Sequence, residues 1–296
     1  MEKILEINGL TKSYGRIQAV QNLSLDIPKG SVFGILGPNG SGKTTTLGMV
    51  LGVIKPDSGN FNWFGQQLNF DTKKRVGAIL ETPNFYPYMS GVKNLEIVAS
   101  IKEIRNPKIE ETLNTVGLGE RGHSKFKSYS LGMKQRLAIA SALLSQPEIL
   151  VLDEPTNGLD PQGIAQIREL ILEIASRGIT IIIASHILVE IEKVCTHAAV
   201  LQRGVLRFAG RVEELTGLEG LVEISAADNG ILMNVLNAFD AVESVTEEGG
   251  LLLAKLNKEW SADDINRQLA AQGIFVNHLV FRKASLETQF LNLIEA

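Results

Sequence analysis

One glycine-rich segment has residue types and a spacing that suit the binding of phosphate. Residues 37–44 read GPNGSGKT, which fits the pattern G-x-x-x-x-G-K-S/T, and they stand between an apolar run, VFGIL, and a stretch with helical spacing. Glycines let successive backbone N–H groups curl around phosphate oxygens, and a helix start adds partial positive charge. Lys43 supplies a point charge, and Thr44 offers a hydroxyl to Mg²⁺. We predict a phosphate-binding loop here; the alternative is a coincidental glycine-rich turn.

Two carboxylates follow an apolar run of strand length. Asp153 and Glu154 come directly after the run ILVL. In a parallel sheet this places Asp153 at the carboxyl edge, beside the phosphate loop. We interpret Asp153 as a partner of Mg²⁺ and Glu154 as the residue that polarises the attacking water, since a metal or a lysine nearby keeps neighbouring carboxylates ionised. The alternative is a strand that ends on two solvated acids.

The segments that must position these residues predict an α/β fold. Residues 4–27 alternate apolar segments with polar turns and are expected to form antiparallel strands, and residues 59–65 a short hairpin. Residues 76–80, 149–152 and 179–184 are apolar runs typical of buried strands, and residues 163–177 are helical between the last two. Helical spacing also prevails between about residues 90 and 145, which indicates a helical insertion.

The pattern changes at about residue 215. Strand-like and helix-like segments then alternate, and a capping-box-like start at Ser261 and Asp264 opens the last predicted helix. We therefore predict a large domain over residues 1–214 and a small α+β domain over residues 215–296, which contains no recognisable catalytic constellation.

Composition narrows the class of protein. The 296 residues are 44% hydrophobic with a formal net charge of -4, which disfavours a protein that grips nucleic acid through many phosphate contacts. The lone cysteine, Cys195, cannot form an internal disulfide and is expected to be inert and reduced. Because there is neither an apolar run of about 18 residues nor a signal peptide, we expect a soluble, intracellular chain.

One more motif resembles the signature of a known family. Residues 129–136 read YSLGMKQR, which resembles the signature LSGGQxQR of ATP-binding cassettes and stands just before the strand at 149–152. Ser130 and Gly132 match, whereas Leu131 and Met133 replace the usual Gly and Gln, so the glutamine's contacts are not carried over. A serine and backbone N–H groups at a helix start form an anion site. The resemblance covers about residues 4–213.

The resemblance implies ATP as the nucleotide and roles for further residues. In the family the signature contacts the γ-phosphate held by the other cassette, so a chain with one cassette implies a dimer. The resemblance also implies a D-loop at Asp160, a switch histidine at His186 and an adenine-stacking aromatic at Tyr14; the ordinary alternatives are a structural histidine and a core tyrosine. The implied nucleotide-binding set is Tyr14, Gly37, Pro38, Asn39, Gly40, Ser41, Gly42, Lys43, Thr44, Thr45, Ser130, Gly132 and Asp160, and the catalytic pair is Glu154 and His186.

Position 81 departs from the usual family residue. The family ordinarily has glutamine after the strand at 76–80, and this chain has Glu81 in the segment ILETPNFYP. That segment and SLGMKQR are similar to cassettes of the bacitracin-resistance and lantibiotic-immunity type. A carboxylate also binds Mg²⁺, so the expected metal ligands are Thr44, Glu81 and Asp153. The alternative is an exposed loop acid.

These observations favour the ATP-hydrolysing subunit of a transporter. We expect an exporter of a peptide antibiotic or another amphipathic compound, peripheral on the inner face of the cell membrane, that drives a separate membrane-spanning permease through residues 81–88. One alternative is a soluble cassette ATPase that acts on ribosomes or DNA, but these usually carry two cassettes or a long coiled-coil insertion. Another is a P-loop GTPase, but the N-K-x-D motif is missing. The C-terminal domain is expected to be an accessory to dimerisation.

Overall fold

The computed structural model describes residues 2–80, 84–215, 220–256, 260–283, 290 and 293, leaving aside the side chains of residues 220 and 281–283. The chain forms two compact units, Met1–Gly210 and Arg211–Ala296. We call them the N-terminal unit and the C-terminal unit and describe each by itself.

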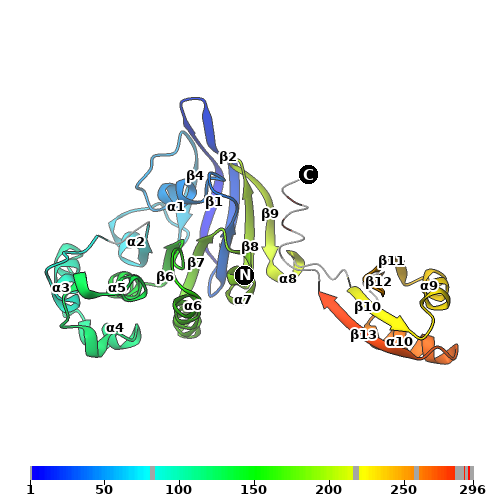
Figure 1. Cartoon of the computed structure of the whole chain (residues 1–296). Coiled ribbons are helices and arrows are strands. Elements are labelled where there is room, and N and C mark those ends of the chain that lie inside the picture. The colour runs from blue at the N-terminus through cyan, green and yellow to red at the C-terminus, as the bar shows by residue number, and fades with distance from the viewer. Residues whose placement is uncertain are drawn as a thin grey trace. The chain divides into compact units, whose positions relative to one another are not determined.

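A six-stranded sheet lies at the centre of the N-terminal unit (Figure 1). Its order is β5-β6-β7-β3-β8-β9, and the pairs from β5 to β8 are parallel. All residues of β3, β6 and β7 are buried, which explains why these strands are continuous apolar runs in the sequence. The strands are β3 (Val32–Leu36), β5 (Val76–Ile79), β6 (Ile149–Asp153), β7 (Thr180–Ser185), β8 (His197–Gln202) and β9 (Val205–Arg211).

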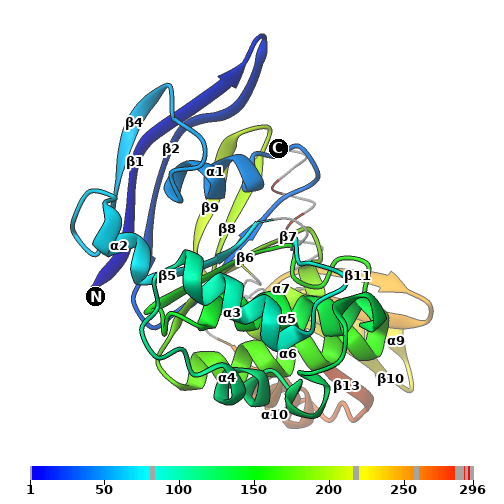
Figure 2. The same cartoon turned by 90° about the vertical axis from the view of Figure 1, so that its left-hand side faces the viewer.

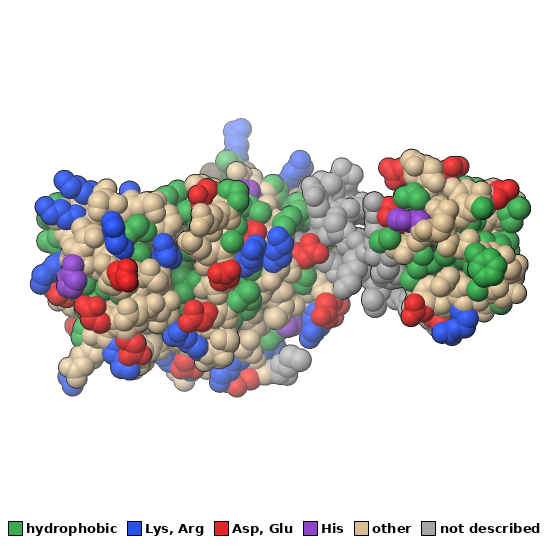
Figure 3. Space-filling view, turned by 60° about the horizontal axis from the view of Figure 1, so that its bottom comes forward, with side chains coloured by type: hydrophobic (Ala, Val, Ile, Leu, Met, Phe, Trp, Pro, Cys, Tyr) green, Lys and Arg blue, Asp and Glu red, His purple; other side chains and the backbone are tan. Residues whose placement is uncertain are grey.

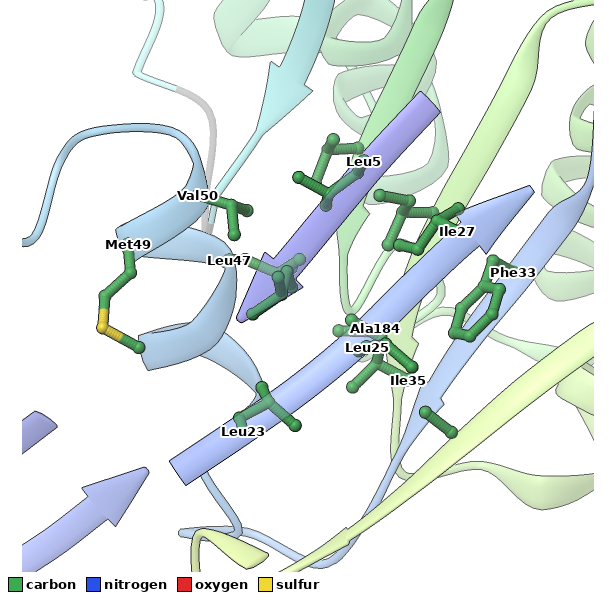
Figure 4. Close-up of a cluster of buried hydrophobic side chains, with 14 of the residues drawn as sticks. Leu5, Leu23, Leu25, Ile27, Phe33, Ile35, Leu47, Met49, Val50 and Ala184 are labelled. Atoms are coloured by element: carbon green, nitrogen blue, oxygen red, sulfur yellow. The ribbon is translucent and has the colours of Figure 1, made fainter. Parts of the chain in front are cut away.

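A three-stranded antiparallel sheet packs against this centre. It has the order β2-β1-β4, with β1 (Lys3–Tyr14), β2 (Ile17–Pro28) and β4 (Ser58–Trp63). Apolar side chains such as Leu5, Leu25 and Leu47 join it to helix α1 (Lys43–Val50) and to the central sheet (Figure 4). The predicted hairpin at residues 59–65 is wrong: β4 is one strand that pairs with β1, and it ends in a turn where Trp63 and Gln66 form an isolated bridge.

Helices fill the predicted insertion between residues 90 and 145 (Figure 2). Ser90 caps α3, because its side chain accepts a hydrogen bond from the Lys93 N–H. The helices are α3 (Gly91–Ile101), α4 (Ile109–Thr115), η1 (Gly119–Arg121), η2 (Phe126–Ser128) and α5 (Leu131–Leu143). Elsewhere in this unit lie α2 (Phe70–Lys74), α6 (Pro161–Ser176) and α7 (Leu188–Val194). The predicted α/β fold with an antiparallel sheet and a helical insertion is confirmed.

The C-terminal unit is a small α+β fold with its own core. After the short helix α8, its strands and helices follow the order β-α-β-β-α-β, and the antiparallel sheet has the order β11-β12-β10-β13. Val222, Leu252 and Leu269 are completely buried in its apolar cluster. The elements are α8 (Val212–Leu215), β10 (Gly220–Ala226), α9 (Asn229–Asn237), β11 (Val242–Glu248), β12 (Leu251–Leu256), α10 (Ala262–Ala271) and β13 (Val276–Lys283). The predicted capping box at Ser261 and Asp264 begins α10.

Three further features bear on the predicted class. In the part of the chain that the structure describes, no helix combines the length and the apolar character needed to cross a membrane. Cys195 is buried, and burial raises the pKa of its thiol, so it stays protonated near neutral pH. On the face drawn in Figure 3, Lys and Arg side chains alternate with Asp and Glu side chains over the N-terminal unit.

Candidate functional site

The segment 37–42 joins the end of β3 to the start of α1 and has the form of a phosphate cradle. Gly42 precedes α1 with a φ of 104°, and a Cβ there would lie 2.3 Å from the Ala19 carbonyl oxygen, so only glycine fits. Pro38, Asn39 and Gly40 are exposed. The first N–H groups of a helix have no acceptor within the helix, so those of α1 can bind an anion.

Lys43 is held inside this loop. Its side chain is 6% exposed, and its ammonium donates hydrogen bonds to the carbonyl oxygens of Gly37 (2.8 Å) and Pro38 (3.4 Å). The same ammonium lies 3.5 Å from Glu154 Oε1. A buried charge needs partners, and phosphate oxygens are stronger acceptors for an ammonium than neutral carbonyls are.

Glu154 and His186 stand at the carboxyl ends of the neighbouring strands β6 and β7. Glu154 Oε2 lies 2.8 Å from His186 Nδ1, and the Glu154 N–H donates to the Ala184 carbonyl (2.9 Å). Glu154 has a φ of 48°, a left-handed conformation that costs a non-glycine residue about 1–2 kcal/mol. The surrounding contacts therefore hold this carboxylate in a strained position between a lysine and an imidazole.

The polar atoms around the loop fit a nucleotide with Mg²⁺. The buried hydroxyls of Ser41 and Thr46 have no hydrogen-bond partner among the described residues, so they have capacity left for a ligand. Asp153, at the end of β6, is 4% exposed, whereas Thr44 is exposed at the start of α1. Hydroxyl and carboxylate oxygens are the donors that Mg²⁺ prefers.

The predicted second anion site lies at the start of α5. Ser130 is exposed and caps this helix, since its Oγ accepts a hydrogen bond from the Met133 N–H (3.3 Å). The loop at residues 158–160 lies beside it: a Cβ on Gly158 would be 3.3 Å from Leu131 Cδ2. Asp160 caps α6 by accepting a hydrogen bond from the Gly163 N–H (2.8 Å), which is a structural role in its own right.

Among the remaining predicted site residues, the structure describes Tyr14, Gly132 and Thr45 but not Glu81. Tyr14, at the end of β1, is 49% exposed, with the Lys12 ammonium 5.6 Å from the centre of its ring, so it is not a core tyrosine. Gly132 and Thr45 are half-buried. Glu81 lies outside the described residues.

Thr46 is a buried polar residue that the sequence analysis did not consider. It is the third threonine of the run at 44–46, and its hydroxyl is buried in the first turn of α1 without a partner in the described part of the chain. The signal was a polar residue at a buried position of a helix, where an apolar residue is the usual choice.

Comparisons with known proteins agree with this geometry. The family model described as ABC transporter matches residues 20–157. The bacitracin transport ATP-binding protein BcrA of Enterococcus faecalis is 36% identical, over 99% of this chain and 97% of that protein. The lantibiotic transport ATP-binding protein SrtF of Streptococcus pyogenes is 38% identical, over 75% of this chain and 95% of that protein.

Solved structures share the fold of the N-terminal unit. The protein described as cbiO1 from Clostridium perfringens, part of the ABC transporter complex cbiONQ, superposes with a TM-score of 0.66 at 27% identity, over 73% of this chain and 91% of that one. The ATP-binding cassette MJ0796, a dimer bound to ADP and Pi, superposes with a TM-score of 0.62 at 25% identity, over 71% of this chain and 99% of that one.

Proposed function

Because the chain belongs to the ABC transporter family as an ATP-binding subunit, we propose that it hydrolyses ATP at the site formed by the phosphate loop, Asp153, Glu154 and His186. Membership in the family makes the chain a nucleotide-binding ATPase of a transporter. The individual roles of its residues are our proposal, and the observation that carries them is the contact between Lys43, Glu154 and His186.

Glu154 is the proposed general base. A water aligned for attack on the γ-phosphate must lose a proton, and a carboxylate within hydrogen-bond reach of that water can accept it. His186 holds one carboxylate oxygen at 2.8 Å, and Lys43 lies 3.5 Å from the other. The lysine exchanges its loop carbonyls for phosphate oxygens when ATP binds, and the loop N–H groups hold the other phosphate oxygens.

Thr44, Asp153 and Glu81 are the proposed ligands of Mg²⁺, which neutralises charge on the triphosphate when it is bound. Thr44 and Asp153 flank the cradle at the start of α1 and the end of β6. The proposal for Glu81 rests on its position in the sequence, directly after the segment that contains β5.

Subunits of this family dimerise and work with membrane permeases, and one solved relative is a dimer with ADP and Pi. We extend this to a dimer of identical chains in which Ser130, Gly132 and Asp160 of one chain complete the site of the other. Ser130 and Asp160 are both exposed, and their two loops lie side by side, which suits a shared surface.

The proposed cargo is a peptide antibiotic. Two relatives that cover most of this chain are described as bacitracin and lantibiotic transport proteins. The permease is a separate membrane-spanning protein, and the subunit binds it at the inner face of the membrane. The C-terminal unit is proposed to support the dimer.

Expression of the chain in cells that contain its membrane partner tests this function. We expect the purified chain to hydrolyse ATP, to co-purify with a multi-span membrane protein, and to raise cellular resistance to bacitracin or a lantibiotic. The Glu154→Gln variant should retain the partner and lose the resistance. Equal resistance with this variant would show that hydrolysis at Glu154 does not drive the export.

A further inference from the structure

Two leucines join the start of α5 to the loop before α6. Leu131 is the first residue of α5, and its Cδ2 atom lies 3.3 Å from the position that a Cβ on Gly158 would take. In return, Leu159 Cδ2 lies 3.9 Å from the position that a Cβ on Gly132 would take. Each leucine therefore has a glycine of the other segment beside it. We call these four residues the leucine clasp: Leu131, Gly132, Gly158 and Leu159.

Leu131 is the residue of the clasp that departs from the family signature, in which glycine is usual at this position. A glycine has no side chain, so it would not reach Gly158. Gly158 itself has a φ of 75°, and a Cβ there would come closer to Leu131 Cδ2 than the ordinary carbon–carbon contact of about 3.5–4.0 Å. The contact thus depends on a leucine that the usual signature lacks and on a glycine that leaves room for it.

The clasp lies between the starts of two helices that run side by side, α5 and α6 (Figure 1). Ser130 caps α5 by accepting a hydrogen bond from the Met133 N–H, and Asp160 caps α6 by accepting one from the Gly163 N–H. Each cap acts within its own helix. The clasp acts between the two helices, so it fixes where Ser130 stands relative to Asp160.

The clasp is at the surface rather than in the core. Leu131 is 48% exposed and Leu159 is half-buried. An apolar contact between such side chains removes only part of their area from water, so it contributes little to the stability of the fold. Its main consequence is geometric, because it joins two segments whose exposed polar residues are proposed to meet the partner chain.

We propose that Leu131 and Leu159 are positioning residues, and that the clasp presents Ser130 and Asp160 to the partner chain as one preformed surface. The inference rests on the proposed function, which supplies the dimer, and names the residues that prepare its surface. Association costs less free energy when fewer groups have to be immobilised. With the clasp open, the start of α5 and the loop before α6 each have to be ordered when the dimer closes.

ATP-driven dimerisation of the full-length Glu154→Gln chain, measured by sedimentation, tests the inference. In this background Leu131→Ala and Leu159→Ala should each weaken the dimer about tenfold at saturating ATP, since two mobile segments must then be ordered on association. The double variant should be no weaker than either single variant, because the loss of one leucine already opens the clasp. Leu131→Met keeps a long apolar side chain and should preserve the dimer. Leu172→Ala, at a leucine of α6 that is 43% exposed, is the matched control and should also preserve it.

Measurements on the chain without a partner separate positioning from folding. The ATP affinity of the single chain and its unfolding midpoint should not change in Leu131→Ala, because the clasp lies on the surface. Amide hydrogen exchange at residues 157–160, measured without ATP, should be faster in Leu131→Ala than in the wild-type chain, although the substitution lies on α5. The Leu172→Ala control should leave this exchange unchanged.

The outcomes separate the two proposals. If the Glu154→Gln chain forms no dimer with ATP, the proposed dimer fails and the inference is overturned with it. If the dimer forms and the effects of Leu131→Ala and Leu159→Ala add in the double variant, each leucine acts on the partner by itself and the clasp does not position the surface. Unchanged dimer affinity, or unchanged exchange at residues 157–160, in Leu131→Ala would likewise overturn the inference while the proposed function stands.

Discussion

In the central sheet of the N-terminal unit the neighbouring strands from β5 to β8 run parallel, whereas in the C-terminal unit every neighbouring pair is antiparallel. Parallel strands end at the same edge, so Asp153 and His186 arrive beside the phosphate loop. Antiparallel strands send their ends in opposite directions, and polar side chains pair across the sheet instead, as Lys255 and Glu243 do at 3.1 Å. The direction of the strands thus decides which unit can gather a catalytic set.

The two units also differ in which residues adopt left-handed backbone conformations. Glu154 adopts a left-handed conformation at the edge of the parallel sheet. In the described part of the C-terminal unit, positive φ angles occur only at Gly249, Gly250 and Gly273, which adopt them at little cost. In the N-terminal unit Phe64 and Arg203 adopt the same conformation in turns, so this strain points to a functional site only together with the contacts of the Glu154 carboxylate.

The largest expected effect comes from a matched pair of glutamates. Each unit has a glutamate next to a histidine: Glu154 lies 2.8 Å from His186, and Glu223 lies 3.7 Å from His278. Glu154→Gln should lower kcat by roughly 10²–10⁴-fold because the amide cannot accept the proton of the attacking water, while ATP still binds. Glu223→Gln should leave kcat unchanged. Steady-state hydrolysis assays decide this, and near wild-type turnover of Glu154→Gln would refute the assignment of the base.

The next effect concerns the stability of each unit. Leu152 in β6 and Leu252 in β12 are both completely buried, so either Leu→Ala change should destabilise its own unit by about 2–5 kcal/mol. Calorimetry with and without ATP assigns each unfolding transition to one of the units. At an ATP concentration of about 100 times Kd, ATP should stabilise the N-terminal unit by about 2.7 kcal/mol. The transition that Leu252→Ala lowers should not move with ATP. If ATP raises both transitions equally, the two units do not unfold independently.

A smaller effect is expected for lysines. Lys43→Ala removes a charge-assisted contact to phosphate and should weaken ATP binding by about 1.5–3 kcal/mol. Lys255→Ala removes a lysine that pairs within the C-terminal sheet and should not change ATP affinity. Isothermal titration of both variants with ATP measures the difference. Unchanged affinity in Lys43→Ala would contradict the phosphate-loop assignment.

The smallest expected effect is the dependence of stability on pH. A hydrogen bond from Lys12 lowers the pKa of Asp57 in the N-terminal unit, and one from Ser261 lowers the pKa of Asp264 in the C-terminal unit. A lowered pKa stabilises the folded state above the unfolded value of about 3.9, and this stabilisation is lost as the pH falls through the folded pKa.

Unfolding midpoints between pH 2 and 6 test this in each unit. Asp57→Asn should reduce the fall of the unfolding midpoint of the N-terminal unit at acid pH. Asp264→Asn should reduce the same fall in the C-terminal unit. Asp263→Asn, one residue earlier on α10, is the control and should retain the wild-type slope. A wild-type slope in Asp264→Asn would show that its capping box does not contribute to acid unfolding.

The sequence by itself determined the local elements, because periodicity and end signals act over a few residues. The continuous apolar runs predicted the buried strands β6 and β7, and the capping-box pattern predicted the start of α10. The glycine and lysine spacing predicted the loop between β3 and α1. The hairpin at residues 59–65 failed because β4 pairs with β1, a partner about fifty residues earlier that no local pattern identifies.

Only the tertiary structure decided which side chains meet. Lys43, Glu154 and His186 come from three segments, and the packing of β3, β6 and β7 brings Lys43 and His186 each within 3.5 Å of the Glu154 carboxylate. The left-handed backbone of Glu154 also depends on that packing, since a glutamate does not favour it locally. Likewise Lys73 and Lys102 line one surface hollow because α2 and the end of α3 lie against it. Contacts between distant segments depend on how the elements pack, and that packing is a property of the whole core rather than of any short stretch of sequence.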